Sequence, residues 1–330
     1  MAAPVLRVFS YLPNPRVWKA LIAADLCGVE VEVSGDKGAN LGSWLWDYEA
    51  RPLDERERTA DSPHARIGRR GFSGTLFKTD AFLAAHPFGT VPAAFSPGGE
   101  VGIFESNSIL RAVARQGAGA RSLYGRDDYE ASRIDSFLDA NLVFAREAQV
   151  YLLGMREPDA ATHERMAAAY EFYLAGVESA LGRTAYLVGD ELSIADISFV
   201  CDFAQFLREG HYEDELAKAG LPLVSRDGAA EHPKAYAHML RLSETRCVRE
   251  THGDVSQLVS PQDGGRMTVP WGRGRLALAR AAGRVKTQWL WSVVSFSTPR
   301  RIAEARLSAR ARARRPRPKT PSYRRVLLAS

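Results

Sequence analysis

The sequence contains little cysteine and no long apolar run. Its three cysteines, Cys27, Cys201 and Cys247, are far apart, and none belongs to a C-x-x-C pair. The pattern therefore indicates neither a dithiol redox centre nor a metal site, and predicts small buried hydrophobes in a reducing compartment. No stretch approaches the roughly twenty apolar residues of a membrane helix, and residues 1–10 lack the pattern of a signal peptide. We expect a cytoplasmic protein.

Charge is distributed unevenly along the chain. The net charge of +5 conceals a segment, residues 271–330, that holds sixteen Lys and Arg and one acid, Glu304, so the preceding residues carry −10. This predicts an acidic globular body followed by a basic tail over residues 257–330. The tail lacks the apolar content of a core and is expected to be poorly ordered. An acidic surface, a membrane surface or nucleic acid could be its partner.

The N-terminal segment alternates between strand and helix patterns. Residues 5–9 are a short apolar run of strand formers, and residues 17–26 place apolar side chains at helical spacings. Gly28 stands where a helix commonly ends, and residues 29–33 alternate valine with glutamate as a half-buried strand does. A strand, a helix and a second strand at this spacing predict a β-α-β unit with parallel strands.

A long insertion interrupts this pattern. Residues 35–74 mix glycine, serine, aspartate and arginine with a few aromatic residues, and we interpret them as a loop that crosses the surface. A short helix is predicted at 78–85. Residues 91–95 and 100–103 then read as strands joined by Ser-Pro-Gly-Gly, which is typical of a β-hairpin, and a helix over 105–114 follows.

The second half of the chain is predicted to be helical. No convincing strand pattern follows a linker at residues 117–127. Amphipathic helical segments cover residues 129–149, 163–181, 193–208 and 232–247. Ser193 and Asp196 have the spacing of a capping box, in which both side chains bind backbone N–H groups at a helix start. The predicted organisation is an α/β domain at 1–118, including the inserted loop, and an all-α domain at 127–256.

Three motifs occur in a fixed order along this framework. They are His-Pro-Phe-Gly-Thr-Val-Pro at 86–92, Phe-Glu-Ser-Asn at 104–107 and Gly-Asp-Glu-Leu-Ser-Ile-Ala-Asp-Ile at 189–197. Over roughly residues 5–255 the chain resembles the glutathione transferase superfamily. The resemblance implies a thioredoxin-like N-terminal domain followed by an all-helical bundle. Residues 18–24 and the Phe-Glu-Ser-Asn quartet look most like the gamma subunit of eukaryotic elongation factor one B and related bacterial transferases.

The resemblance implies glutathione as a co-substrate. Thioredoxin-like domains bind this peptide as an added strand, and a cis peptide bond before Pro92 would expose the backbone of Val91 for that pairing. Glu105 and Ser106 would hold the γ-glutamyl ammonium and carboxylate at the start of the following helix, although a plain helix start is the alternative reading. Lys78 is the candidate for the glycyl carboxylate.

The catalytic position departs from the family pattern. Members place a Ser, Cys or Tyr near the first helix, where it stabilises the glutathione thiolate. The resemblance puts Asn14 there, which can donate a hydrogen bond but cannot ionise, and Ser10 and Tyr11 are the further candidates. Arg16 could face the carboxylates of the ligand. Alternatively, Asn14 only caps the helix, and the site binds glutathione without catalysing.

The first functional hypothesis is a transferase in which bound glutathione thiolate attacks a small, hydrophobic and aromatic electrophile. Conjugation, ether cleavage and dehalogenation share that step and are not separated here. The alternative is a non-catalytic binding or scaffolding module. By resemblance we expect a homodimer, with the electrophile between the domains. Aromatic residues that could line its site are Trp44, Trp46, Tyr48, Phe144 and Tyr151.

Overall fold

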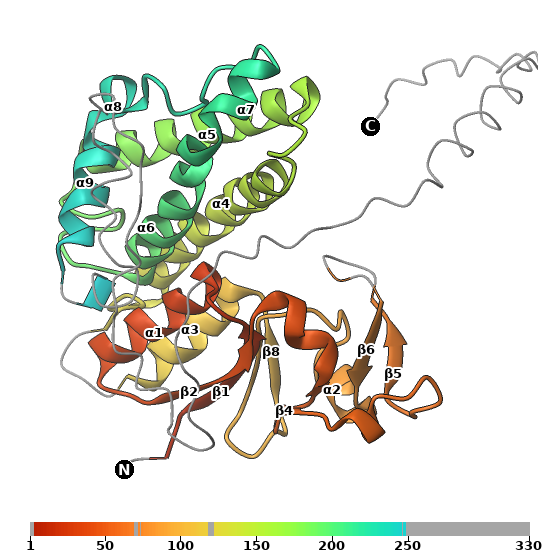
Figure 1. The fold of residues 1–330 in the computed structure, drawn as a ribbon. Helices are drawn as coiled ribbons and strands as arrows, with labels where there is room; N and C mark the ends of the chain where they lie inside the picture. Colours follow the sequence, from red (N-terminus) through yellow and green to blue (C-terminus); the bar gives the residue numbers. More distant parts are fainter. Residues whose placement is uncertain (1–2, 69–71, 73, 118–121, 246, 249–330) are drawn as a thin grey trace, which may run out of the picture. The chain divides into compact units, whose positions relative to one another are not determined.

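The computed structural model describes residues 3–68, 72, 74–117, 122–245 and 247–248. The basic tail predicted at 257–330 lies outside these residues. Figure 1 shows the described residues as a ribbon, coloured along the sequence.

The chain begins with the predicted β-α-β unit. Strand β1 (Leu6–Tyr11) is parallel to β2 (Val31–Asp36), and the two are connected by helix α1 (Pro15–Cys27). Gly28 ends α1 in the left-handed conformation, with φ of 66°. Gly35 pairs with Ser10, and a Cβ at Gly35 would lie 1.7 Å from the Ser10 carbonyl oxygen, so a larger residue would force the strands apart.

A β-hairpin completes the first sheet. Strands β7 (Ala93–Phe95) and β8 (Gly102–Phe104) are antiparallel, and β7 also pairs antiparallel with β1, so the strand order is β2-β1-β7-β8. Helix α3 (Ser106–Gln116) follows directly. The predicted hairpin and helix are therefore confirmed, with boundaries shifted by one or two residues.

The insertion is a folded layer, which corrects its interpretation as a surface loop. Its elements are η1 (Gly38–Ser43), β3 (Trp44–Trp46), β4 (Arg51–Pro52), η2 (Glu55–Glu57), β5 (Ala65–Ile67) and β6 (Thr75–Lys78). The strands form a second sheet in the order β4-β3-β6-β5. Helix α2 (Asp80–Ala85) begins two residues later than predicted, because Lys78 ends β6 and Thr79 caps the helix.

The two faces of the first sheet have different partners. Alternation along β1 points Leu6 and Val8 into one apolar cluster and Phe9 into another. The first cluster continues through α1 and α3 into the helical domain. The second contains Trp46 of the insertion and Phe82 of α2. The inserted sheet and α2 therefore help to cover the face of the first sheet opposite α1 and α3.

The second domain is all-α, as predicted. Its elements are α4 (Asp128–Leu153), α5 (Ala160–Leu181), α6 (Ile194–Phe206), η3 (Leu207–Tyr212), α7 (Glu213–Lys218), α8 (Gly228–Glu231) and α9 (Pro233–Ser243). Helix α6 packs against α4, and also against α1 of the first domain (Figure 1). The capping box of Ser193 and Asp196 at the start of α6 is confirmed.

Among the described residues, none of the helices is both long enough and apolar enough to span a membrane.

Candidate glutathione-binding site

Strands β1 and β8 end, and β7 begins, at the same end of the first sheet. Phe9 of β1 and Phe104 of β8 both pair with Ala93 of β7, and β7 runs antiparallel to both. Two residues beyond this row are Tyr11 after Phe9, Val91 before Ala93 and Ser106 after Phe104. The strand register therefore brings Tyr11, Val91 and Ser106 to the same end of the sheet, although up to 95 residues separate them in the sequence.

Asn14 forms the N-cap of α1. Its Oδ1 accepts a hydrogen bond from the backbone N–H of Arg16 at 2.9 Å, and its Nδ2 donates to Ser10 Oγ at 2.9 Å. Pro15 occupies the first helical position, which is a common helix-start arrangement. Asn14 and Ser10 are both fully buried. Their side chains bind each other and the backbone, and this geometry favours the capping interpretation of Asn14 over the catalytic one.

Tyr11 differs from these two residues because its side chain is only half-buried. Burial raises the pKa of its phenol, while the guanidinium groups of Arg16 and Arg208 partly oppose that rise. Arg208 belongs to η3 of the helical domain, and its guanidinium carbon lies 5.9 Å from the ring centre of Trp18. Tyr11 is thus a neutral hydrogen-bond donor at physiological pH, in the field of one arginine from each domain.

The peptide bond between Val91 and Pro92 is cis, as expected from the resemblance. Val91 is half-exposed, and the first paired residue of β7 is Ala93. The side chain of Pro92 is buried. Val91 therefore lies two residues before the first residue of β7 that pairs with β1.

Helix α3 begins without a side-chain cap. Glu105 occupies the N-cap position with φ of 64°, and it is the one non-glycine among the described residues with positive φ. A strained backbone of this kind commonly marks a functional position. The side chain of Glu105 is exposed, and that of Ser106 is 6% exposed. The first N–H groups of α3 form an anion-binding geometry, since helix starts carry partial positive charge.

Behind Ser106 lies a buried lysine that the sequence analysis did not select. The Nζ of Lys19 is 2.6 Å from Asp202 Oδ2, 2.9 Å from Asn107 Oδ1 and 3.4 Å from Ser106 Oγ. Lys19 and Asp202 are each 1% exposed. The available signal was a lysine inside the apolar stripe of the first helix, directly after Trp18, where a charge needs a buried partner.

Lys78, the candidate for the glycyl carboxylate, has other contacts. Its Nζ donates to the carbonyl of Gly89 at 2.6 Å and lies 4.5 Å from the ring centre of Trp46. Burial lowers the pKa of Lys78. Burial also lowers the pKa of His86, and the nearby charge of Lys78 lowers it further. A role for Lys78 in binding a carboxylate stays a prediction.

Most aromatic residues assigned to a substrate site belong instead to the cores. Trp46 is fully buried in the core of the first domain, and Phe144 and Tyr151 are 1% and 3% exposed in the helical core. Trp44 and Tyr48 are partly buried against the same core as Trp46. The assignment is wrong for the three buried residues, because their side chains are packed inside the cores and cannot line an open site.

Cys27 and Cys201 are unsuited to nucleophilic chemistry. Burial raises the pKa of the Cys27 thiol and that of Cys201. A raised thiol pKa lowers the thiolate fraction at neutral pH.

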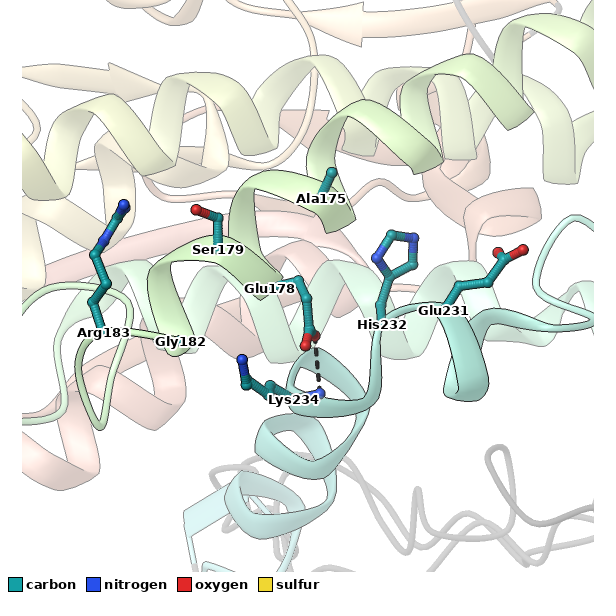
Figure 2. A pocket seen from close by; sticks show the side chains of 8 residues that line it. All are labelled: Ala175, Glu178, Ser179, Gly182, Arg183, Glu231, His232 and Lys234. Atoms are coloured by element: carbon teal, nitrogen blue, oxygen red, sulfur yellow. Dashed lines mark hydrogen bonds between the residues drawn. The ribbon is translucent and has the colours of Figure 1, made fainter.

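A shallow depression of about 520 Å³ lies on the helical domain and is lined by residues between 175 and 234 (Figure 2). There Glu178 Oε2 accepts hydrogen bonds from the backbone N–H groups of Lys234 and Ala235 and so caps α9. Nearby, potential metal-ligating atoms of Glu171, Glu231 and His232 lie within 4.8 Å of one another. His232 is hydrogen-bonded to Glu171 at 3.1 Å, and this contact accounts for the arrangement without a metal.

A solved structure shares the fold of the described residues. A glutathione transferase from Phanerochaete chrysosporium, solved with oxidized glutathione, superimposes with a TM-score of 0.53. The match covers 79% of this chain and 99% of that one at 17% sequence identity. A thioredoxin-like domain followed by an all-α domain is therefore the architecture of the described residues. No family model matches the chain.

Sequence relatives establish the family. A glutathione S-transferase-like protein of Aspergillus aculeatus is 34% identical over 190 residues, which are 56% of this chain and 82% of the relative. A second such protein, from a Fusarium species, is 27% identical over 255 residues, covering 76% of this chain and 94% of the relative. The chain belongs to the glutathione transferase superfamily.

The resemblance to the elongation factor is also confirmed. A probable elongation factor 1-gamma of Arabidopsis thaliana is 28% identical over 201 residues, or 60% of this chain. The chain spans 40% of the length of that relative.

Proposed function

We propose that this chain is a glutathione-dependent transferase in which a bound glutathione thiolate attacks a small hydrophobic electrophile. The observation that carries the proposal is that the strand register places Tyr11, Val91 and Ser106 at the same end of the sheet. An extended peptide can pair with the backbone of Val91, and its carboxylate can reach the N–H groups and hydroxyl at the start of α3. Family membership supports the same ligand.

Tyr11 is the best-placed thiolate stabiliser among the three predicted catalytic residues. Asn14 and Ser10 are buried and bonded to each other, whereas the neutral phenol of Tyr11 can donate a hydrogen bond to sulfur. Arg16 and Arg208 add positive charge to its surroundings. A donor and nearby cations both favour the ionised form of a thiol whose ordinary pKa is about 8.5.

The second candidate function is non-catalytic binding of glutathione or a protein scaffold. The burial of Asn14, the residue at the family's catalytic position, favours it, as does the similarity to elongation factor 1-gamma. The transferase and the glutathione-binding module use the same half-site, so these two differ only in what happens to the bound thiol.

Retention on immobilised glutathione tests the binding part of the proposal. We expect the chain to be retained and to be eluted by free glutathione, but not by free glutamate. Ultraviolet absorbance of thiolate on saturation with glutathione tests the catalytic part. Retention without new thiolate absorbance would leave the glutathione-binding module as the function, and no retention would contradict both the transferase and the glutathione-binding module, leaving the scaffold.

We also propose a homodimer. Helix α4 carries four apolar side chains that are 40% to 67% exposed: Leu142, Val143, Val150 and Leu153. An exposed apolar face of this kind is typical of an interface. Light scattering after size exclusion is expected to give twice the mass of the chain. A monomer at micromolar concentration would contradict this proposal.

A further inference from the structure

The buried ammonium of Lys19 uses all three of its hydrogens. It donates to a carboxylate of the helical domain, Asp202, and to two side chains of α3, Asn107 and Ser106. An ammonium has three donors and no acceptor, so these contacts satisfy it completely. Lys19 thereby joins α1, α3 and α6 at one point.

Further contacts fix the first turn of α3 in place. Asn107 Oδ1 also lies 2.9 Å from Ser198 Oγ of α6, and Asn107 Nδ2 donates to the Leu138 carbonyl of α4 at 2.8 Å. The Ser198 hydroxyl is also 2.7 Å from Asn141 Oδ1. Two helices of the second domain therefore hold the residue that follows Ser106.

The contact with Lys19 determines what the Ser106 hydroxyl can do. Its oxygen accepts from the ammonium at 3.4 Å, so its own hydrogen is directed to another acceptor. Hydrogen bonds in a chain polarise one another, and the donor end of such a chain suits an anion. The chain runs from a cation to the hydroxyl of Ser106, which is the first residue of α3.

We infer that Lys19 is a positioning residue for an anionic ligand group at the start of α3, acting through the Ser106 hydroxyl and through its own charge. The inference rests on the proposed function, in which that group is the γ-glutamyl carboxylate of glutathione. Asp202 then has an opposing role, because its negative charge, 2.6 Å from Lys19 Nζ, partly cancels the field that reaches the ligand. The pair sets ligand affinity as well as joining the domains.

A purely structural role for the pair makes different predictions. If Lys19 and Asp202 only hold the domains together, changing either residue would weaken every ligand in the same direction. If Lys19 assists the carboxylate, its removal weakens only ligands that carry this group. Removal of the Asp202 charge alone then strengthens them.

Calorimetric titration with two ligands separates these roles. Glutathione carries the γ-glutamyl group, and cysteinylglycine is the same peptide without it. The variants are Lys19→Met with Asp202→Asn, which removes both charges together and leaves no unpaired ion, and Asp202→Asn alone. Lys218→Met, an exposed lysine at the end of α7, is the matched control. Thermal unfolding followed by circular dichroism shows the temperature below which each variant is folded, and the titrations are made below it.

We expect the double variant to bind glutathione about tenfold more weakly, with cysteinylglycine affinity unchanged. Asp202→Asn alone should bind glutathione several-fold more tightly, and Lys218→Met should match the wild type. Equal effects on both ligands, or weaker glutathione binding by Asp202→Asn, would overturn the inference. Failure of the wild-type chain to bind either ligand is a separate outcome that would overturn the proposed function itself.

Discussion

At the scale of single residues, the account depends on which hydroxyl faces the bound thiol. Asn14 and Ser10 form a closed pair at the start of α1, joined at 2.9 Å and shielded from solvent. Tyr11 is the neighbouring residue on β1, and its half-buried phenol lies in the field of Arg16 and Arg208. Ser10, which is bonded to Asn14, and Tyr11, the candidate catalytic residue, are therefore consecutive in the sequence.

Tyr11→Phe should lower turnover about ten- to a hundredfold while changing glutathione affinity little, because a hydrogen bond to a charged group contributes about 1.5–3 kcal/mol. Steady-state kinetics with an activated aryl chloride would measure the change. Tyr129→Phe is the control, since Tyr129 is 89% exposed on α4. An unchanged turnover number in Tyr11→Phe would remove Tyr11 from the mechanism.

The pH dependence follows from the direction of the Tyr11 shift. Burial raises the pKa of the phenol above its ordinary value of about 10, and only the neutral form donates a hydrogen bond. Stabilisation of the thiolate by Tyr11 is therefore retained from neutral pH up to at least about pH 10. We expect the ratio of wild-type to Tyr11→Phe turnover to be largest near pH 6 and to fall as the pH approaches the thiol pKa of the variant, because the bound thiol then ionises without the hydrogen bond. A ratio that does not change between about pH 6 and 9 would contradict the assignment.

The ion pair of Lys19 and Asp202 also has a consequence for stability. Oδ1 of Asp202 has no hydrogen-bond partner among the described residues, and Lys19 binds Oδ2. Lys19→Met leaves a buried carboxylate alone, which should lower the free energy of unfolding by about 3–5 kcal/mol. Adding Asp202→Asn should recover much of that loss in urea denaturation. A loss below about 1 kcal/mol in Lys19→Met would show that the pair is not buried as described.

At the scale of secondary structure elements, the start of α6 is the most predictable feature. Ser193 and Asp196 form a capping box, and because both residues bind backbone groups of the same helix start, their spacing in the sequence is enough to predict it. Asp196 also has contacts outside this helix start. Its Oδ1 accepts a hydrogen bond from the Leu187 N–H and lies 2.8 Å from His238 Nε2. The local motif was visible in the sequence, whereas its partner on α9 was not.

The insertion shows where sequence patterns fail. Its strands are two to four residues long, and β3 pairs with β6 across 32 positions, so no periodic pattern develops within any one of them. Trp46 is fully buried there, with its Nε1 donating to the Leu41 carbonyl at 3.0 Å. The aromatic residues in this segment marked a small core rather than a binding surface.

Trp46→Ala should therefore destabilise the whole first domain, by about 3–5 kcal/mol, because it removes a large side chain from a packed core. Trp44→Ala, which changes a partly buried tryptophan two residues away, is the comparison and should have a smaller effect. Both effects can be measured by thermal or urea denaturation. Similar small losses for both variants would mean that the insertion is a peripheral surface loop.

At the scale of the whole molecule, the order of elements was predictable and the contacts between domains were not. The motifs at 86–92, 104–107 and 189–197 indicated the architecture, which the relatives and the structure support. Lys19 and Asp202, however, are 183 residues apart, and neither belongs to those motifs. Ionic contacts between domains depend on tertiary packing that no local spacing encodes.

The central claim is that the start of α3 binds the carboxylate of glutathione, and calorimetric titration of Ser106→Ala tests it most directly. We predict measurable binding by the wild-type chain, about tenfold or greater weakening by Ser106→Ala, and no change in Ser132→Ala, which removes an exposed hydroxyl on α4. Equal affinities of the wild-type chain and Ser106→Ala for glutathione would contradict the claim.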